Sequence, residues 1–241
     1  MGNPIDRGTL DTLMDAGRAA VEFNSPMSTA RADSIVESIA GRTYSVASPT
    51  MVDFGCGRGR LIQKVVERSP GGRGLGLDTD ETSLAAARHD AATTGLAERV
   101  NFQAVDASAW KGVCDVAICV GSSHIFGGPA EMFKSLAAQQ PEVAVVGLEM
   151  WEAEPTAWCL EQFGEMAPGI DSLGEQARAA GWQVEAQSTS SLAEWDGFEE
   201  TWIGGVRSLG TDVAVGFASE RYEAYQRYRG VLGFGWLTLV R

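Results

Sequence analysis

Residues that build metal sites and disulfides are scarce in this chain of 241 residues. It has only two histidines, His89 and His124. Its four cysteines form no C-x-x-C pair: Cys56, Cys114, Cys119 and Cys159. Zinc sites need cysteine or histidine ligands at short spacings, so we expect no metal site. We also expect the four thiols to be reduced, as they are in the cytoplasm.

Basic residues are few as well, and long apolar runs are lacking. Nineteen Lys and Arg stand against 32 Asp and Glu, which gives a net charge of -13. Nucleic acids are bound through Lys and Arg, so this charge argues against a DNA or RNA partner and favours a small-molecule substrate. No apolar run approaches the roughly 20 residues of a membrane span, and the N-terminus lacks the pattern of a signal peptide. We therefore expect a cytoplasmic protein with no membrane partner, whose oligomeric state stays open.

Glycine is abundant, with 29 residues, and three of them follow a predicted apolar strand in VDFGCGRGRL, residues 52–61. Asp78 comes nineteen residues after the third of these glycines, at the end of a second apolar strand. Glycines let the backbone pass close to a ligand, and an acidic side chain at the tip of the next strand accepts hydrogen bonds from ribose hydroxyls. This arrangement is typical of a nucleotide-binding βαβ unit.

The spacing of the glycines indicates which nucleotide binds. A dinucleotide fingerprint counted from Gly55 needs glycine at position 60, where this chain has Arg60. The pattern from Asp53 through Gly55 and Gly57 resembles motif I of class I S-adenosyl-L-methionine (SAM)-dependent methyltransferases. The resemblance implies SAM as cofactor and S-adenosyl-L-homocysteine (SAH) as product. It also implies that the backbone around Gly55, Cys56 and Gly57 contacts the methionine part of SAM.

The order of predicted elements is that of an α/β protein. Helices over 6–22 and 28–40 precede an alternation of strands and helices from 51 to 148, which implies a parallel sheet with helices on both faces. The resemblance implies a Rossmann-like, seven-stranded class I methyltransferase sheet. About forty residues separate the predicted sixth and seventh strands, far more than a hairpin needs, so we predict a helical cap inserted between them. We expect a single domain, 1–241, with N-terminal helices in 1–45, a SAM-binding core in 50–150 and the cap insertion in 190–230.

Further cofactor contacts are predicted at the ends of the first four strands. Asp53 either organises the glycine loop or reaches the ammonium group of the methionine part through water. Asp78, with Thr79 beside it, is predicted to accept from both ribose hydroxyls; the alternative is a helix N-cap, which Thr79 or the next residue would serve instead. The resemblance implies that Asp106 and Ala107 hold adenine, with helix capping by Asp106 as the alternative. A backbone carbonyl near Val120 is expected to face the SAM ammonium.

The loop GSSHIFGG, residues 121–128, follows the predicted fourth strand at the edge where α/β proteins bind ligands. His124 lies in this loop, and an imidazole suits a general base near neutral pH. We predict that His124 contacts the substrate and takes its proton. The alternative is a histidine that hydrogen-bonds its own loop, and for His89 a surface role is expected.

Aromatic and acidic residues gather in the last third of the chain and are expected to form the substrate wall. The main candidates are Glu149, Trp151, Trp195, Trp202 and Tyr222. Aromatic faces with carboxylates suit a cationic or amine-bearing ligand, whereas the alternative for the tryptophans is packing within the cap. Segments 121–128, 149–151, 194–202 and 228–239 together resemble a branch of bacterial small-molecule methyltransferases.

The predicted function is therefore SAM-dependent methyl transfer to an oxygen, nitrogen or carbon atom of a small molecule. One alternative is a SAM-binding sensor or accessory protein without turnover, which would keep the same motifs. Another is an NAD-dependent oxidoreductase, which Arg60 and the long helical N-terminus disfavour.

Overall fold

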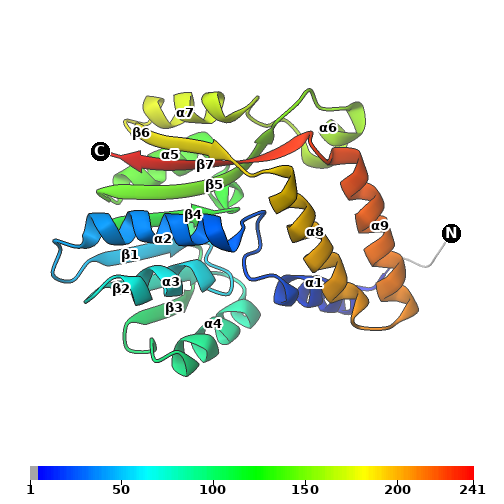
Figure 1. The fold of residues 1–241 in the computed structure, drawn as a ribbon, viewed down its shortest axis with the longest axis horizontal. Coiled ribbons are helices and arrows are strands. Elements are labelled where there is room, and N and C mark those ends of the chain that lie inside the picture. Colours follow the sequence, from blue (N-terminus) through cyan, green and yellow to red (C-terminus); the bar gives the residue numbers. More distant parts are fainter. Residues whose placement is uncertain (1–4) are drawn as a thin grey trace.

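The computed structural model describes residues 5–241 and is built around one mixed sheet (Figure 1). The strand order is β3-β2-β1-β4-β5-β7-β6. The first five strands are parallel, and β7 runs antiparallel to both of its neighbours. The strands are β1 (Thr50–Phe54), β2 (Arg73–Asp78), β3 (Val100–Ala104), β4 (Val116–Val120), β5 (Val143–Trp151), β6 (Gln183–Thr189) and β7 (Leu232–Val240). This is the α/β fold with the seven-stranded sheet that was predicted.

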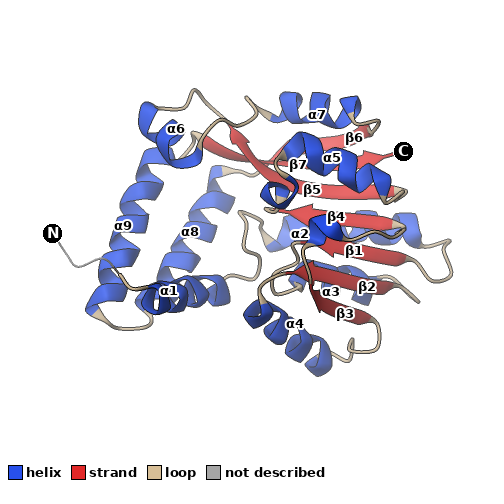
Figure 2. Ribbon diagram, turned by 180° about the vertical axis from the view of Figure 1, so that it is seen from behind, coloured by secondary structure: helices blue, strands red, loops and turns tan. Residues whose placement is uncertain are grey.

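Helices cover both faces of the sheet, as the alternation of elements predicted (Figure 2). One face carries α2 (Thr29–Thr43), α3 (Arg60–Arg68) and α4 (Glu81–Thr93), and the other carries α5 (Pro129–Ala138) and α7 (Ile170–Ala179). Each layer buries an apolar cluster against the sheet, and burial of apolar surface is the main term that holds such layers together. The two clusters centre on Ile39, Ile62 and Leu84 and on Phe133, Leu136 and Leu173.

The cap consists of α8 (Leu192–Arg207) and α9 (Asp212–Tyr228), which lie between β6 and β7 in the chain. Both helices stand beside the C-terminal ends of the parallel strands (Figure 1). Helix α1 (Arg7–Ala20) packs against α8, because Gly17 leaves room for the Trp202 ring where any Cβ would overlap it. The two N-terminal helices, predicted as one segment over 1–45, therefore separate: α1 joins the cap and α2 joins the sheet.

Two elements differ from the sequence-based expectation. Strand β5 continues to Trp151, three residues past its predicted end at 148, because β7 pairs with its last residues. Helix α6 (Ala157–Phe163) was not predicted. It has seven residues and is capped by Thr156, so it is too short to show a helical apolar period.

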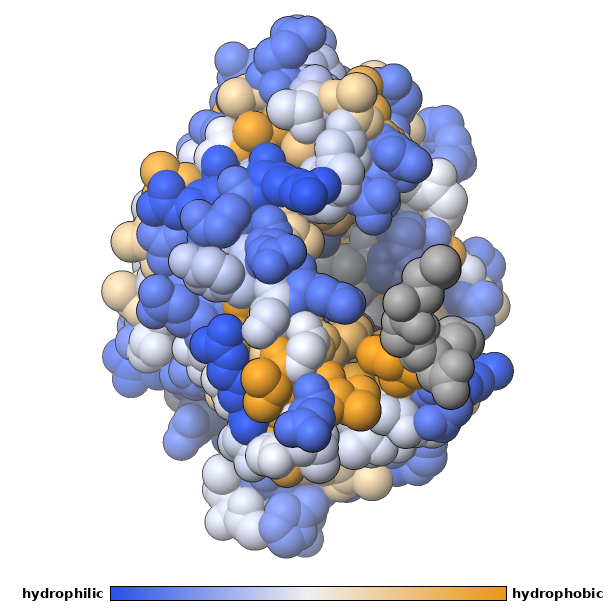
Figure 3. All heavy atoms as spheres, turned by 90° about the vertical axis from the view of Figure 1, so that its right-hand side faces the viewer, coloured by the Kyte–Doolittle hydropathy of each residue, from blue (hydrophilic) through white to orange (hydrophobic). Residues whose placement is uncertain are grey.

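The surface on the cap side is mostly hydrophilic, with hydrophobic side chains gathered on its lower part (Figure 3). Exposed apolar side chains of this lobe include Leu10 of α1 and Val213 and Val215 of α9. Among the helices of residues 5–241, none is long and apolar enough to cross a membrane.

Candidate active site

A cavity of about 400 Å³ lies at the C-terminal ends of the parallel strands. This is the edge at which open α/β sheets bind their ligands, and the volume is in the range of small-molecule sites. All nine residues predicted to bind the cofactor line it, together with His124: Asp53, Gly55, Cys56, Gly57, Asp78, Thr79, Asp106, Ala107 and Val120. The fold thus brings together side chains and backbone from the ends of four strands.

The glycine loop is fastened to both neighbouring strands. The backbone N–H groups of Gly55 and Cys56 donate to the carbonyl of Leu77 at 2.8 and 2.9 Å. Gly55 has a positive φ of 76°, and a Cβ at this position would overlap the side chain of Ser122, which follows β4. Glycine is therefore required here both for its backbone angle and for the close approach of the two loops.

Asp78 shapes the loop as well as facing the cavity. Its Oδ2 accepts from the Gly57 N–H at 2.7 Å, and its Oδ1 accepts from the N–H groups of Thr79 and Asp80 at 2.8 and 3.0 Å. Asp80 is the N-cap of α4, which rules out that alternative role for Asp78. Because a carboxylate oxygen has two lone pairs, Oδ2 keeps one free for a ribose hydroxyl while Oδ1 is filled.

Asp106 takes the capping role, and the adenine role stays a prediction. Its Oδ1 accepts from the backbone N–H and the hydroxyl of Ser108 at 2.9 and 2.7 Å, which caps a short 3₁₀ helix over Ala107–Ala109. These hydrogen bonds lower the pKa of Asp106. Its Oδ2 has no hydrogen-bond partner among residues 5–241, so this oxygen is available to an adenine amino group.

Asp53 is buried at the end of β1, with 4 % of its surface exposed, and it faces the cavity. Burial, followed by the charge of Asp78, raises the pKa of Asp53 to about 8. Within the described part of the chain no group donates a hydrogen bond to this carboxyl, so it does not fasten the loop. A neutral, unpartnered acid in this place fits a cationic ligand, which would restore its charge.

His124 lies in a short 3₁₀ helix, Ser123–Phe126, directly after β4, and its side chain is exposed at the cavity. Its imidazole has no hydrogen-bond partner among the described residues, so the alternative role of fastening its loop is not seen. The ring is free to meet a ligand.

The five residues of the predicted substrate wall do not line this cavity. Trp202 has 1 % of its surface exposed and is covered by α1 and by the Arg221 guanidinium, 3.8 Å from the ring centre. Tyr222 is half exposed on α9. Trp151 and Trp195 are buried in one aromatic cluster, and Glu149 is half-buried on β5. These positions favour packing roles for the tryptophans, which was the alternative interpretation.

Sequence reasoning did not name the residues of one wall of the cavity, which the N-terminal part of the chain supplies. Arg18 at the end of α1 and the segment 21–27 line it, opposite the glycine loop. Arg18 also approaches the Asp80 carboxylate to 3.9 Å, so α1 reaches across to the start of α4. The segment FNSPMS, residues 23–28, joins the two predicted N-terminal helices, and no local pattern shows that it folds over the cavity.

Known proteins that are similar to this chain include methyltransferases. Residues 51–140 match a family model described as a methyltransferase domain. A solved SAM-dependent methyltransferase from Geobacter sulfurreducens, in complex with SAH, superposes with a TM-score of 0.81 at 22% identity, over 95% of this chain and 98% of that one. The uncharacterized protein YjhP of Escherichia coli is 28% identical over 206 residues, 83% of this chain and 71% of that protein. A tRNA1(Val) (adenine(37)-N6)-methyltransferase of Vibrio cholerae is 32% identical over 68 residues, 28% of each chain.

Residues 51–140 thus match a methyltransferase domain, and the chain shares its fold with that solved SAM-dependent methyltransferase. The match agrees with the predicted methyltransferase, for which the sequence leads us to expect SAM as cofactor and SAH as product. The NAD-dependent alternative receives no support from these relatives.

Proposed function

We propose that this protein transfers the methyl group of SAM to a small-molecule acceptor. The proposal rests on one observation: all nine predicted cofactor residues and His124 line the same cavity. When bound there, SAM supplies a methyl group already activated by its sulfonium. The chain holds the rest of the molecule, with Asp78 toward the ribose, Asp106 and Ala107 toward the adenine, and the glycine loop toward the methionine part.

The acceptor is expected beyond Val120, between the loop that carries His124 and the cap. His124 takes the proton that an attacking hydroxyl, amine or carbon acid must lose, and proximity supplies the rest of the rate. The net charge of -13 supports a small molecule over a nucleic acid as the acceptor. The four free cysteines support a reducing, cytoplasmic location.

A transfer assay tests this function. The protein is incubated with SAM labelled in its methyl group and with pooled amines, phenols and carboxylic acids, and label is followed into small molecules. We expect label to appear with the unaltered protein and to be lost in Asp78→Ala. Binding of SAH without any transfer would support the alternative, a sensor or accessory protein that does not turn over.

Binding of SAM is expected to release a proton from Asp53. Its carboxyl is mostly neutral at pH 7 because its pKa is about 8, and a cationic ligand favours the ionised form. Binding must displace a proton from Asp53 below pH 8, so affinity rises with pH, by about tenfold between pH 6 and pH 7, where the ammonium of SAM stays protonated. Calorimetry in buffers of different ionisation enthalpy measures the proton released.

Asp53→Asn is the matched control for that linkage. It keeps the shape of the side chain but has no proton to lose, so the release attributable to this site should disappear. SAM has its own ionising groups, and their contribution cancels in the comparison of the two proteins. Equal proton release in both would contradict the linkage.

A further inference from the structure

Three of the four acidic residues of α8 are paired with arginines, and the fourth, Glu200, is exposed. Arginine partners hold these three carboxylates at N–O distances of 2.7 to 2.8 Å: Arg31 for Glu194, Arg229 for Asp196 and Arg221 for Glu199. None of them is therefore left to recognise a cationic ligand.

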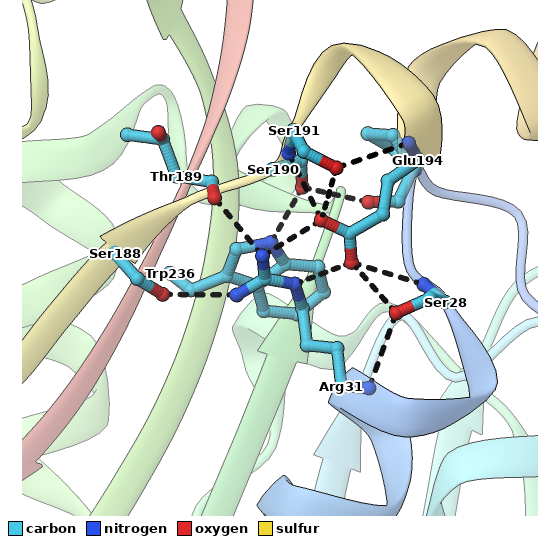
Figure 4. A network of polar contacts seen from close by, with 9 residues as sticks. Ser28, Arg31, Ser188, Thr189, Ser190, Ser191, Glu194 and Trp236 are labelled. Carbon is cyan, nitrogen blue, oxygen red and sulfur yellow. Dashed lines mark hydrogen bonds and ion pairs between the residues drawn. The ribbon is translucent and has the colours of Figure 1, made fainter.

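Glu194 shows how complete this pairing is (Figure 4). Its carboxylate accepts from Arg31 of α2 and from Ser28, and it closes the capping box of α8 with Ser191. Arg31 also donates to the hydroxyl of Ser188 and to the carbonyl of Thr189, both at 2.9 Å. The network joins α2, β6 and α8, and its charges are satisfied from within the protein.

Glu149 is different. It lies on β5 opposite Phe234 of β7, two residues from Gly147 and therefore on the same face of the strand. The rings of Phe234 and Trp236 lie over that face, 2.7 Å from where a Cβ of Gly147 would be. Within residues 5–241, no other residue forms a hydrogen bond or ion pair with the Glu149 side chain. Burial raises the pKa of Glu149, and its own backbone N–H and then the nearby imidazole of His124 partly oppose that rise.

Two hydrogen-bond donors in the same aromatic cluster also have no partner. The indole N–H groups of Trp151 and Trp195 are buried and find no acceptor in the described part of the chain. An unpaired buried polar group costs about 1–3 kcal/mol, so native proteins rarely keep several together without a reason. Val120 and Met27 belong both to this cluster and to the wall of the cofactor cavity. The cluster therefore borders the cofactor cavity.

We propose that the acceptor binds where this aromatic cluster borders the cofactor cavity, at Val120 and Met27, and that Glu149 selects an amine, which enters as its ammonium form. The inference rests on the proposed function and names its substrate class. An ammonium group gives the carboxylate a partner, and the surrounding aromatic rings favour a cation.

Methyl transfer to the amine begins with the loss of a proton. The ammonium gives one proton to His124, and the freed lone pair on nitrogen forms the new bond to the methyl carbon. The bond between that carbon and sulfur breaks, and its electron pair stays on sulfur in SAH. The product is the N-methylated ammonium, and His124 then releases its proton to solvent.

Matched probes test the amine preference. Phenethylamine, 2-phenylethanol and 3-phenylpropanoate have similar shapes and differ in charge, and calorimetry measures their binding to the SAH complex. We expect the amine to bind at least about tenfold more tightly than the other two, which corresponds to one charge-assisted hydrogen bond. Glu149→Gln should abolish this preference, and Glu152→Gln, an exposed neighbour, should keep it.

Three results would overturn the inference: an alcohol or carboxylate that binds as well as the amine, no binding of the amine, or a preference that survives in Glu149→Gln. Each variant is first titrated with SAH alone. Failure of that step contradicts the proposed function, whereas normal SAH binding without an amine preference contradicts only the acceptor class.

Thermal unfolding of Glu149→Gln adds a readout that needs no acceptor. Removing an unpaired, desolvated carboxylate is expected to raise the unfolding temperature at pH 8 by about 2 to 4 °C. A lower unfolding temperature would mean that the carboxylate has an internal partner, which contradicts the inference.

Discussion

Replacing Asp78 with alanine is expected to weaken SAH binding about a hundredfold while the protein stays folded. The substitution removes one charge-assisted hydrogen bond to the ribose, and such bonds contribute about 1.5–3 kcal/mol. It also removes the acceptor for three backbone N–H groups, on Gly57, Thr79 and Asp80, which hold the loops in place. Calorimetric titration with SAH measures the loss, and circular dichroism checks the fold.

Asp80→Ala is the matched control. This aspartate lies two residues further on and caps α4 by accepting from the N–H groups of Thr82 and Ser83. Its loss should cost about 1 kcal/mol of stability, as cap removal does, and change SAH affinity only a few-fold. An unchanged affinity in Asp78→Ala would remove the ribose assignment.

His124→Gln is expected to lower turnover about a hundredfold without changing the affinity for SAH. A positioned general base contributes at least about a hundredfold, and glutamine keeps polarity but accepts no proton at neutral pH. The imidazole has no partner within residues 5–241, so its removal breaks no hydrogen bond that holds the fold. Single-turnover rates and SAH titrations on the same preparation separate the two quantities.

The second histidine of the chain provides the control for that experiment. His89 is exposed on α4, so His89→Gln should leave both turnover and SAH affinity unchanged. If His124→Gln turned over normally, His124 would not be the base, and proximity alone would carry the reaction.

The cofactor half of the site was predictable because its chemistry is local. Gly55, Gly57 and Asp78 stand at positions fixed by one strand, one turn and the next strand, and their backbone bonds close within that unit. The alternation of strands and helices predicted over 51–148 is found from β1 to β5 for the same reason.

The cap half was not predictable, because it depends on contacts between distant residues. Helix α1 belongs to the cap through Gly17 and Trp202, which are far apart in the chain. The aromatic and acidic pattern of α8 was visible, but not the arginines that neutralise it, such as Arg221, which lies 22 residues from Glu199. Only the folded structure shows which carboxylates have an arginine partner and that, within residues 5–241, Glu149 has none.

The most direct test of the central claim is calorimetry of the purified protein with SAM, SAH and NAD. The cavity, its glycine loop and the neutral Asp53 predict micromolar binding of SAM and SAH and no heat with NAD. Binding of NAD in their place, or no binding of either sulfur ligand, would contradict the assignment of this cavity to SAM.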